Sequence, residues 1–126
     1  MRKDLVIVPE DAPGVVASLG ELLGEAGINI EAISAFTGKG RGIVHILVDK
    51  ADEALEVLQA AGIEVAAARR VVVLPLPDEP GALGGACRKL ADADVNIEQA
   101  YIAAGSQLVI VCDDVDRAKD VLGVTE

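Results

Sequence analysis

The sequence has few of the residues that usually mark catalytic or metal sites. Its 126 residues include one histidine, two cysteines and no tryptophan, and its only aromatic residues are Phe36 and Tyr101. Cys87 and Cys112 lie outside any C-x-x-C or Cys/His cluster, so we expect reduced, buried thiols and neither a zinc site nor a redox pair. No nucleophile, base and orienting group can be assembled from the motifs, which favours a protein that is not an enzyme.

Basic residues are also scarce. Lysine and arginine together number 11 against 21 acidic residues, and the resulting net charge of -10 repels phosphate backbones and anionic membranes alike. The apolar run "LVIV" near the N-terminus is too brief for a signal peptide, and no window approaches a membrane-spanning length. We therefore expect a cytoplasmic protein with no nucleic-acid or membrane partner.

What the sequence does contain is a long internal repeat. The stretch "DAPGVVASLGELLGEAGINIEAI" at residues 11–33 returns as "DEPGALGGACRKLADADVNIEQA" at residues 78–100. The Asp-x-Pro-Gly motif and the later Asn-Ile keep one register, which chance explains poorly. The sequence therefore predicts two modules, residues 1–68 and 69–126, without a flexible linker between them.

Each module is expected to follow the order strand, helix, strand, strand, helix, strand. Apolar residues at spacings of three and four predict an amphipathic helix that begins at Pro13 and is capped by Gly27. Alternating residues on both sides of "GKGRG" predict a strand hairpin. The expected elements of the first module are strand 5–8, helix 13–26, strands 29–36 and 43–49, helix 51–61 and strand 63–67.

The second module is shorter than the first. After a helix at about 115–122 only four residues remain, where the first module has its last strand. We therefore predict that the second sheet lacks a full last strand. Because an unpaired sheet edge invites pairing, we also expect a homodimer.

The combination of a strand, "D-x-P-G", an amphipathic helix and "G-I-N-I" before a second strand resembles the ACT domain, a small regulatory module of amino-acid biosynthetic enzymes. The resemblance covers nearly the whole chain, twice. It implies a ferredoxin-like α+β fold for each module, with two helices on one face of an antiparallel sheet. It also implies a stand-alone tandem ACT protein, without a cofactor, in which a small effector, usually an amino acid, binds at the interface between modules and acts allosterically.

The resemblance also implies the residues of the site. In amino-acid-binding members, the acidic or amide residue before Pro-Gly and the asparagine that begins the second strand hold the effector. The matching positions here are Asp11, Pro13, Gly14, Asn29 and Ile30 in the first module, and Asp78, Pro80, Gly81, Asn96 and Ile97 in the second.

The chemistry of these residues suits a zwitterion. Free N–H groups at a helix start attract a carboxylate, an aspartate can hold an ammonium group, and an asparagine amide both donates and accepts. Two alternatives remain open from the residues alone. The aspartates can be turn residues and the asparagines can shape the start of a strand, and the chain can be a regulatory subunit that contacts a separate biosynthetic enzyme through its sheet edge.

Other motifs favour structural roles. The "GKGRG" loop lacks the serine or threonine of a Walker motif and lies between strands, so a plain hairpin is expected. His45 is expected to be a packed or surface strand residue. The aspartates at 113, 114 and 116 fit the start of a helix better than a metal site.

Overall fold

The structure, a computed structural model that describes residues 1–125, divides into two compact units, Met1–Arg69 and Arg70 onward. Each unit begins with the predicted strand, helix, hairpin and helix, so the predicted α+β class with two repeated modules is confirmed. The elements are β1 (Lys3–Ile7), α1 (Val15–Glu25), β2 (Ile30–Gly38), β3 (Arg41–Val48), α2 (Ala51–Ala60), β4 (Val65–Arg70), β5 (Val72–Pro75), α3 (Ala82–Asp92), β6 (Ile97–Ala103), β7 (Gln107–Cys112) and α4 (Val115–Leu122).

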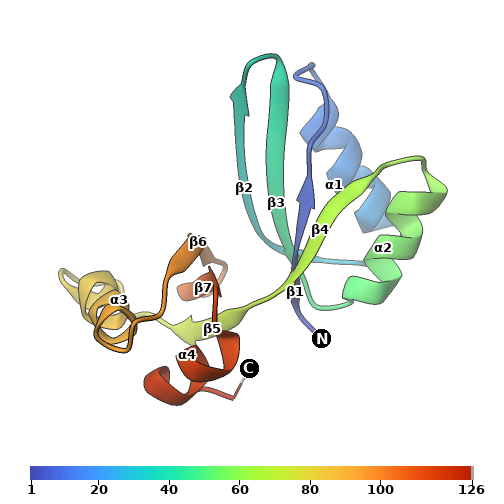
Figure 1. Ribbon diagram of the computed structural model, residues 1–126. Helices are drawn as coiled ribbons and strands as arrows, with labels where there is room; N and C mark the ends of the chain where they lie inside the picture. The colour runs from blue at the N-terminus through green and yellow to red at the C-terminus, as the bar shows by residue number, and fades with distance from the viewer. Residues whose placement is uncertain (126) are drawn as a thin grey trace. The chain divides into compact units, whose positions relative to one another are not determined.

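The first unit is a four-stranded sheet with both helices on one face. The strand order is β2-β3-β1-β4, and β3 pairs antiparallel with both β1 and β2. Figure 1 shows α1 and α2 on the same side of this sheet. The arrangement follows from the alternation of side chains along β1 and β3, whose helix-facing residues are apolar and buried.

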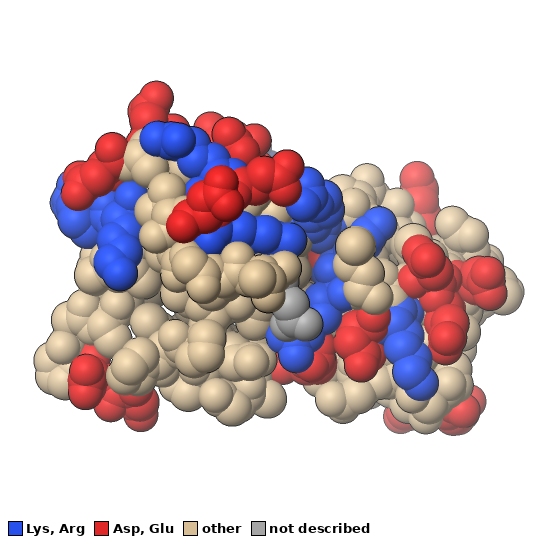
Figure 2. Space-filling view, turned by 90° about the horizontal axis from the view of Figure 1, so that it is seen from below, with Lys and Arg blue, Asp and Glu red and all other residues tan. Residues whose placement is uncertain are grey.

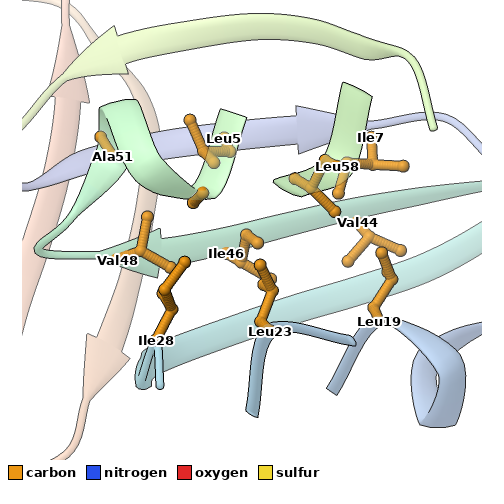
Figure 3. Packing of buried hydrophobic residues seen from close by; sticks show 11 residues of the cluster. Leu5, Ile7, Leu19, Leu23, Ile28, Val44, Ile46, Val48, Ala51 and Leu58 are labelled. Atoms are coloured by element: carbon orange, nitrogen blue, oxygen red, sulfur yellow. The ribbon is translucent and has the colours of Figure 1, made fainter. Parts of the chain in front are cut away.

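The core of the first unit lies between the sheet and the helices. Leu19 and Leu23 are one turn apart on α1, so they share a face, and both are buried. Figure 3 shows their side chains directed toward those of Val44 and Ile46 on β3. Aliphatic side chains alone therefore fill this core, as the lack of aromatic residues requires.

The helix α1 begins two residues later than predicted. Pro13 precedes the helix, and Gly14 is its N-cap with φ 88°, a left-handed conformation that a helical first turn excludes. The second unit repeats this geometry, because Gly81 has φ 87° and α3 begins at the next residue. The prediction that proline occupies the first helical position was wrong, since the chain must turn through a left-handed glycine before the helix can start.

The end of α1 follows the sequence prediction. Gly27 has φ 73°, and the amide of Ile28 donates to the carbonyl of Leu23 at 2.9 Å. This hydrogen bond closes a left-handed glycine cap and buries Ile28 against the helix. Such a cap brings the chain back to the sheet at the first residue of β2.

The strands depart from their predicted bounds at the hairpin and at β4. The hairpin turns through Lys39 and Gly40, both with positive φ, so β2 and β3 are longer than expected. Strand β4 lies later than 63–67 and continues to Arg70, because the alternating segment "VAAARR" prolongs it. Only Val71 separates β4 from β5, in agreement with the predicted absence of a flexible linker.

The second unit has a three-stranded sheet in the order β5-β7-β6, all antiparallel neighbours. This order matches β1-β3-β2 of the first unit, and no strand of the described residues takes the place of β4. The predicted lack of a full last strand is therefore confirmed. A separate core of Val72, Leu90, Leu108 and Ile110 packs between this sheet and α3 and α4.

Candidate functional site

The Asp11–Gly14 turn joins β1 to α1 and is tied to the β2–β3 hairpin. The amide of Gly42 donates to the carbonyl of Pro9 at 2.8 Å, and the amide of Asp11 donates to the carbonyl of Gly40 at 3.3 Å. The guanidinium of Arg41 donates to the carbonyl of Val8 at 2.9 Å. These bonds fix the position of the turn relative to the sheet.

The start of α1 bears neither a side-chain cap nor an acidic residue in its first turn. The first turn of a helix carries N–H groups without partners inside the helix, so this end is a positive electrostatic site. By contrast, α4 is capped by Asp114, whose side chain accepts from the amide of Arg117 at 3.0 Å. The first turn of α1 thus lacks the side-chain acceptor that α4 has.

A hollow of about 280 Å³ lies beside this turn, and we call it the Phe36 hollow. Its walls come from three segments, the β1–α1 turn, the first turn of α1 and the hairpin. Val15, Val16, Ala35, Phe36 and Val44 supply apolar surface, and Asp11, Glu10 and Thr37 supply the side-chain polar groups. A second hollow, of about 270 Å³, borders Pro13 and Gly14 on the side of Ile63.

The second unit has a hollow at the equivalent place, and we call it the Leu83 hollow. It measures about 430 Å³. Seven of its lining residues fall on lining residues of the Phe36 hollow when the two repeats are superposed in sequence. In the order of the chain, the matching positions are Leu76, Pro77, Asp78, Glu79, Ala82, Leu83 and Ile102 in the second unit, and Pro9, Glu10, Asp11, Ala12, Val15, Val16 and Ala35 in the first.

The structure brings only some of the predicted site residues together. Asp11, Pro13 and Gly14 lie at the start of α1 beside the hollows, and Asp78 lines the Leu83 hollow. The Pro80-Gly81 pair lies at the equivalent turn of the second unit, next to α3.

The predicted asparagines lie elsewhere. Asn29 and Ile30 follow the other end of α1, which at 11 residues and 1.5 Å per residue is about 16 Å long. Within one unit, Asn29 is therefore far from Asp11.

Asn96 and Ile97 occupy the corresponding place after α3. The backbone amide of Asn96 donates to a carboxylate oxygen of Asp113 at 3.0 Å, and its carbonyl accepts from the amide of Asp113 at 3.2 Å. These bonds join the start of β6 to the end of β7. The backbone of Asn96 thus shapes the start of a strand, whereas its side chain is exposed.

The walls of the hollows were not predicted from the sequence. Val16 and Phe36 are among the large apolar residues that remain exposed, at 47% and 55%. Phe36 is also the only phenylalanine of the chain, which was a usable signal.

Two groups of the second unit that lie outside the hollows have shifted pKa values. In the second unit, the hydrogen bond and charge of Arg70, at 2.9 Å, lower the pKa of the Asp116 carboxyl. Burial raises the pKa of the Cys112 thiol, which agrees with the expected buried thiol. Figure 2 shows acidic and basic side chains interspersed on the face that it draws, without one large basic area.

No helix of the described residues is long and apolar enough to cross a membrane.

The fold and the repeated turn define a tandem of ferredoxin-like modules with a small hollow beside the first helix of each. The family model for the ACT domain pair matches residues 2–126, and the chain therefore belongs to this family.

Solved structures share this fold over nearly the whole chain. Protein BT0572 from Bacteroides thetaiotaomicron is 28% identical, with a TM-score of 0.86 over 96% of this chain and 85% of that one. The ligand-free regulatory subunit of aspartate kinase from Thermus thermophilus is 24% identical, with a TM-score of 0.72 over 97% and 88%. The corresponding Thermus flavus subunit is 22% identical, with a TM-score of 0.67 over 97% and 89%. No curated protein sequence matches this chain.

Proposed function

We propose that the protein is a non-enzymatic regulatory sensor that binds a free amino acid beside the Asp11–Gly14 turn. The observation that carries the proposal is the uncapped start of α1 next to an open hollow, repeated in the second unit. The N–H groups of the first helical turn bind the carboxylate, and Asp11 binds the ammonium group. Membership of the ACT domain pair family supports a regulatory role.

The distance between Asp11 and Asn29 bears on how the site is completed. Because Asp11 and Asn29 lie beyond opposite ends of α1, which is about 16 Å long, one module cannot place both residues on one small ligand. In a homodimer with a two-fold axis across α1, the start of one helix lies beside the end of its partner's helix. We therefore assign Asp11 and Asn29 of one site to two copies of the chain.

The bound ligand then regulates the protein because it prefers one arrangement of the two copies over the other. A ligand that touches two copies stabilises the paired arrangement only by as much as it prefers that arrangement over the separated one. Assembly of the chain, or contact with a partner enzyme, is the output of the sensor.

The first experiment is thermal unfolding against the twenty amino acids, each at millimolar concentration. A ligand at about 100 times its dissociation constant stabilises the native state by about 2.7 kcal/mol, a shift of several degrees for a chain of this size. Asp11→Ala and Asn29→Ala should remove the shift. Glu56→Gln, which changes an exposed acid on α2 outside the hollows, is the control and should keep it.

Light scattering tests the homodimer. We expect twice the 13.0 kDa mass of the chain at micromolar concentration. A monomer that still binds an amino acid would contradict the assignment of Asp11 and Asn29 to two copies, and a dimer with no ligand in the panel would contradict the sensor.

A second candidate function is that of a regulatory subunit for a separate biosynthetic enzyme. It is favoured by the likeness to aspartate kinase regulatory subunits over almost the full length of both chains. Stoichiometric co-purification of an enzyme, together with no stabilisation by any amino acid, would support this role over the sensor.

A further inference from the structure

We infer that the amino acid bound beside Asp11 has a branched aliphatic side chain, which the Phe36 hollow receives. This inference rests on the proposed function, because it names the class of ligand for the same site. The observation behind it is the composition and size of the hollow, together with its recurrence in the second unit.

The size of the hollow limits the ligand. Pockets for drug-sized molecules span roughly 300 to 1,000 Å³, and the Phe36 hollow holds about 280 Å³. A free amino acid fits such a volume. The hydrogen bonds that tie the turn to the hairpin, such as the 2.8 Å bond from Gly42 to Pro9, fix the walls of the hollow relative to each other.

The charges around the hollow disfavour a ligand that carries a second anionic group in addition to its α-carboxylate. Among residues 1–125, the only ionisable side chains that line it are Glu10 and Asp11, and no lysine, arginine or histidine lines it. A side-chain carboxylate or phosphate would meet two acidic groups in a protein of net charge -10. Aspartate, glutamate and phosphorylated ligands are therefore disfavoured.

The competing class is a basic amino acid, for which Glu10 is the available partner. Glu10 is exposed, and a surface ion pair contributes little to binding because both charges remain solvated. The apolar wall of the hollow contributes more to the free energy of binding than such an ion pair. Phe36 and Val16 expose large apolar surfaces next to the hollow, and covering such surface is favourable in proportion to its area.

The Leu83 hollow of the second unit also has an apolar wall. At the positions of Val16 and Ala35 it has Leu83 and Ile102, both about half exposed. The identities differ between the repeats while the apolar character is the same. Both walls therefore suit an aliphatic side chain, and neither presents a basic group to it.

The test is isothermal titration of the full chain with valine, leucine and isoleucine, and with alanine, serine, lysine and aspartate for comparison. We expect the branched ligands to bind at least about tenfold more tightly than alanine, since each buried methylene adds to affinity. Phe36→Ala should weaken leucine binding about tenfold and alanine binding little. Ile33→Ala is the matched control, because Ile33 lies on the same strand, is 45% exposed and does not line the hollow.

The outcomes separate the two proposals. Selective binding of a branched ligand that weakens in Phe36→Ala and not in Ile33→Ala supports the inference. Preference for lysine, serine or aspartate overturns the inference and leaves the amino-acid sensor intact. Binding of no amino acid overturns both.

Discussion

The imidazole of His45 on β3 hydrogen-bonds to the carboxylate of Asp4 on β1, with Nδ1 2.8 Å from Oδ2. Asp4 has no exposed surface, and the side chain of His45 is 13% exposed. The bond links the side chains of two strands that pair with each other. From the sequence, His45 was expected to be a packed or surface strand residue and its partner was not predicted, since the two residues are brought together only by the pairing of β1 with β3.

Replacing His45 should destabilise the first unit. His45→Leu removes a hydrogen-bond partner of the fully buried Asp4 side chain, and we expect a loss of about 2 kcal/mol or more in the free energy of unfolding. Urea denaturation measures this loss. Ser34→Ala is the control, because Ser34 lies opposite His45 on the neighbouring strand and should change stability by less than about 0.5 kcal/mol. A His45→Leu variant as stable as that control would show that the bond contributes nothing net.

The repeat offers a matched pair of core substitutions. Leu23 on α1 and Leu90 on α3 occupy equivalent positions, and neither has exposed surface. Each change to alanine should cost about 2–5 kcal/mol, from lost burial and the cavity left behind. Hydrogen exchange of each variant should report the loss in the unit that carries the change. Equal loss of protection in both units would instead mean that the chain unfolds as one cooperative body.

Glycine has opposite roles at two nearby positions of the first unit. Gly14 adopts φ 88°, whereas Gly20 lies inside α1, and an added Cβ meets nothing within 4 Å at either position. Gly14→Ala should therefore cost about 1 kcal/mol through backbone strain alone. Gly20→Ala should stabilise by about 0.5–1 kcal/mol, because alanine favours a helix interior. Thermal unfolding measures the sign of the stability change for each variant. A stabilising Gly14→Ala would contradict the left-handed conformation at that position.

The two thiols should differ in reactivity. Cys112 is 3% exposed and burial raises its pKa, so little thiolate forms at a given pH, whereas Cys87 is half-buried on α3. We expect a thiol reagent at pH 8 to label Cys87 first and Cys112 only on unfolding. The single-cysteine variants Cys87→Ser and Cys112→Ser assign each rate, and rapid labelling of Cys112 in the Cys87→Ser protein would contradict the buried assignment.

The same pKa shift sets a pH dependence. The folded state keeps the Cys112 proton to a higher pH than the unfolded state, whose thiol titrates near 9.0. Stability should therefore fall as the pH rises above that value, since the unfolded state then binds fewer protons than the folded state. Comparing the wild type with Cys112→Ser at pH 7 and pH 10 isolates this effect, which the variant should lack.

The element order, the duplication and the shortened second module could be predicted without knowledge of the fold. These follow from local patterns, because apolar spacing sets helices and strands and glycine marks the ends of helices. Even the cap at Gly27 was predictable, since its conformation depends on its immediate neighbours. The start of α1 was not, because Pro-Gly fits either a first helical turn or a left-handed turn, and only the path from β1 chooses between them.

The tertiary structure alone decided what surrounds the site. The Phe36 hollow lies between residues 9–17 and the hairpin, which the rest of α1 and the start of β2 separate in the sequence, so no local sequence pattern predicts which residues line it. Strand pairing likewise decided that Asp4 meets His45. Asp11 and Asn29 of one module lie far apart, because α1, a helix of 11 residues and about 16 Å, stands between the two ends of the motif.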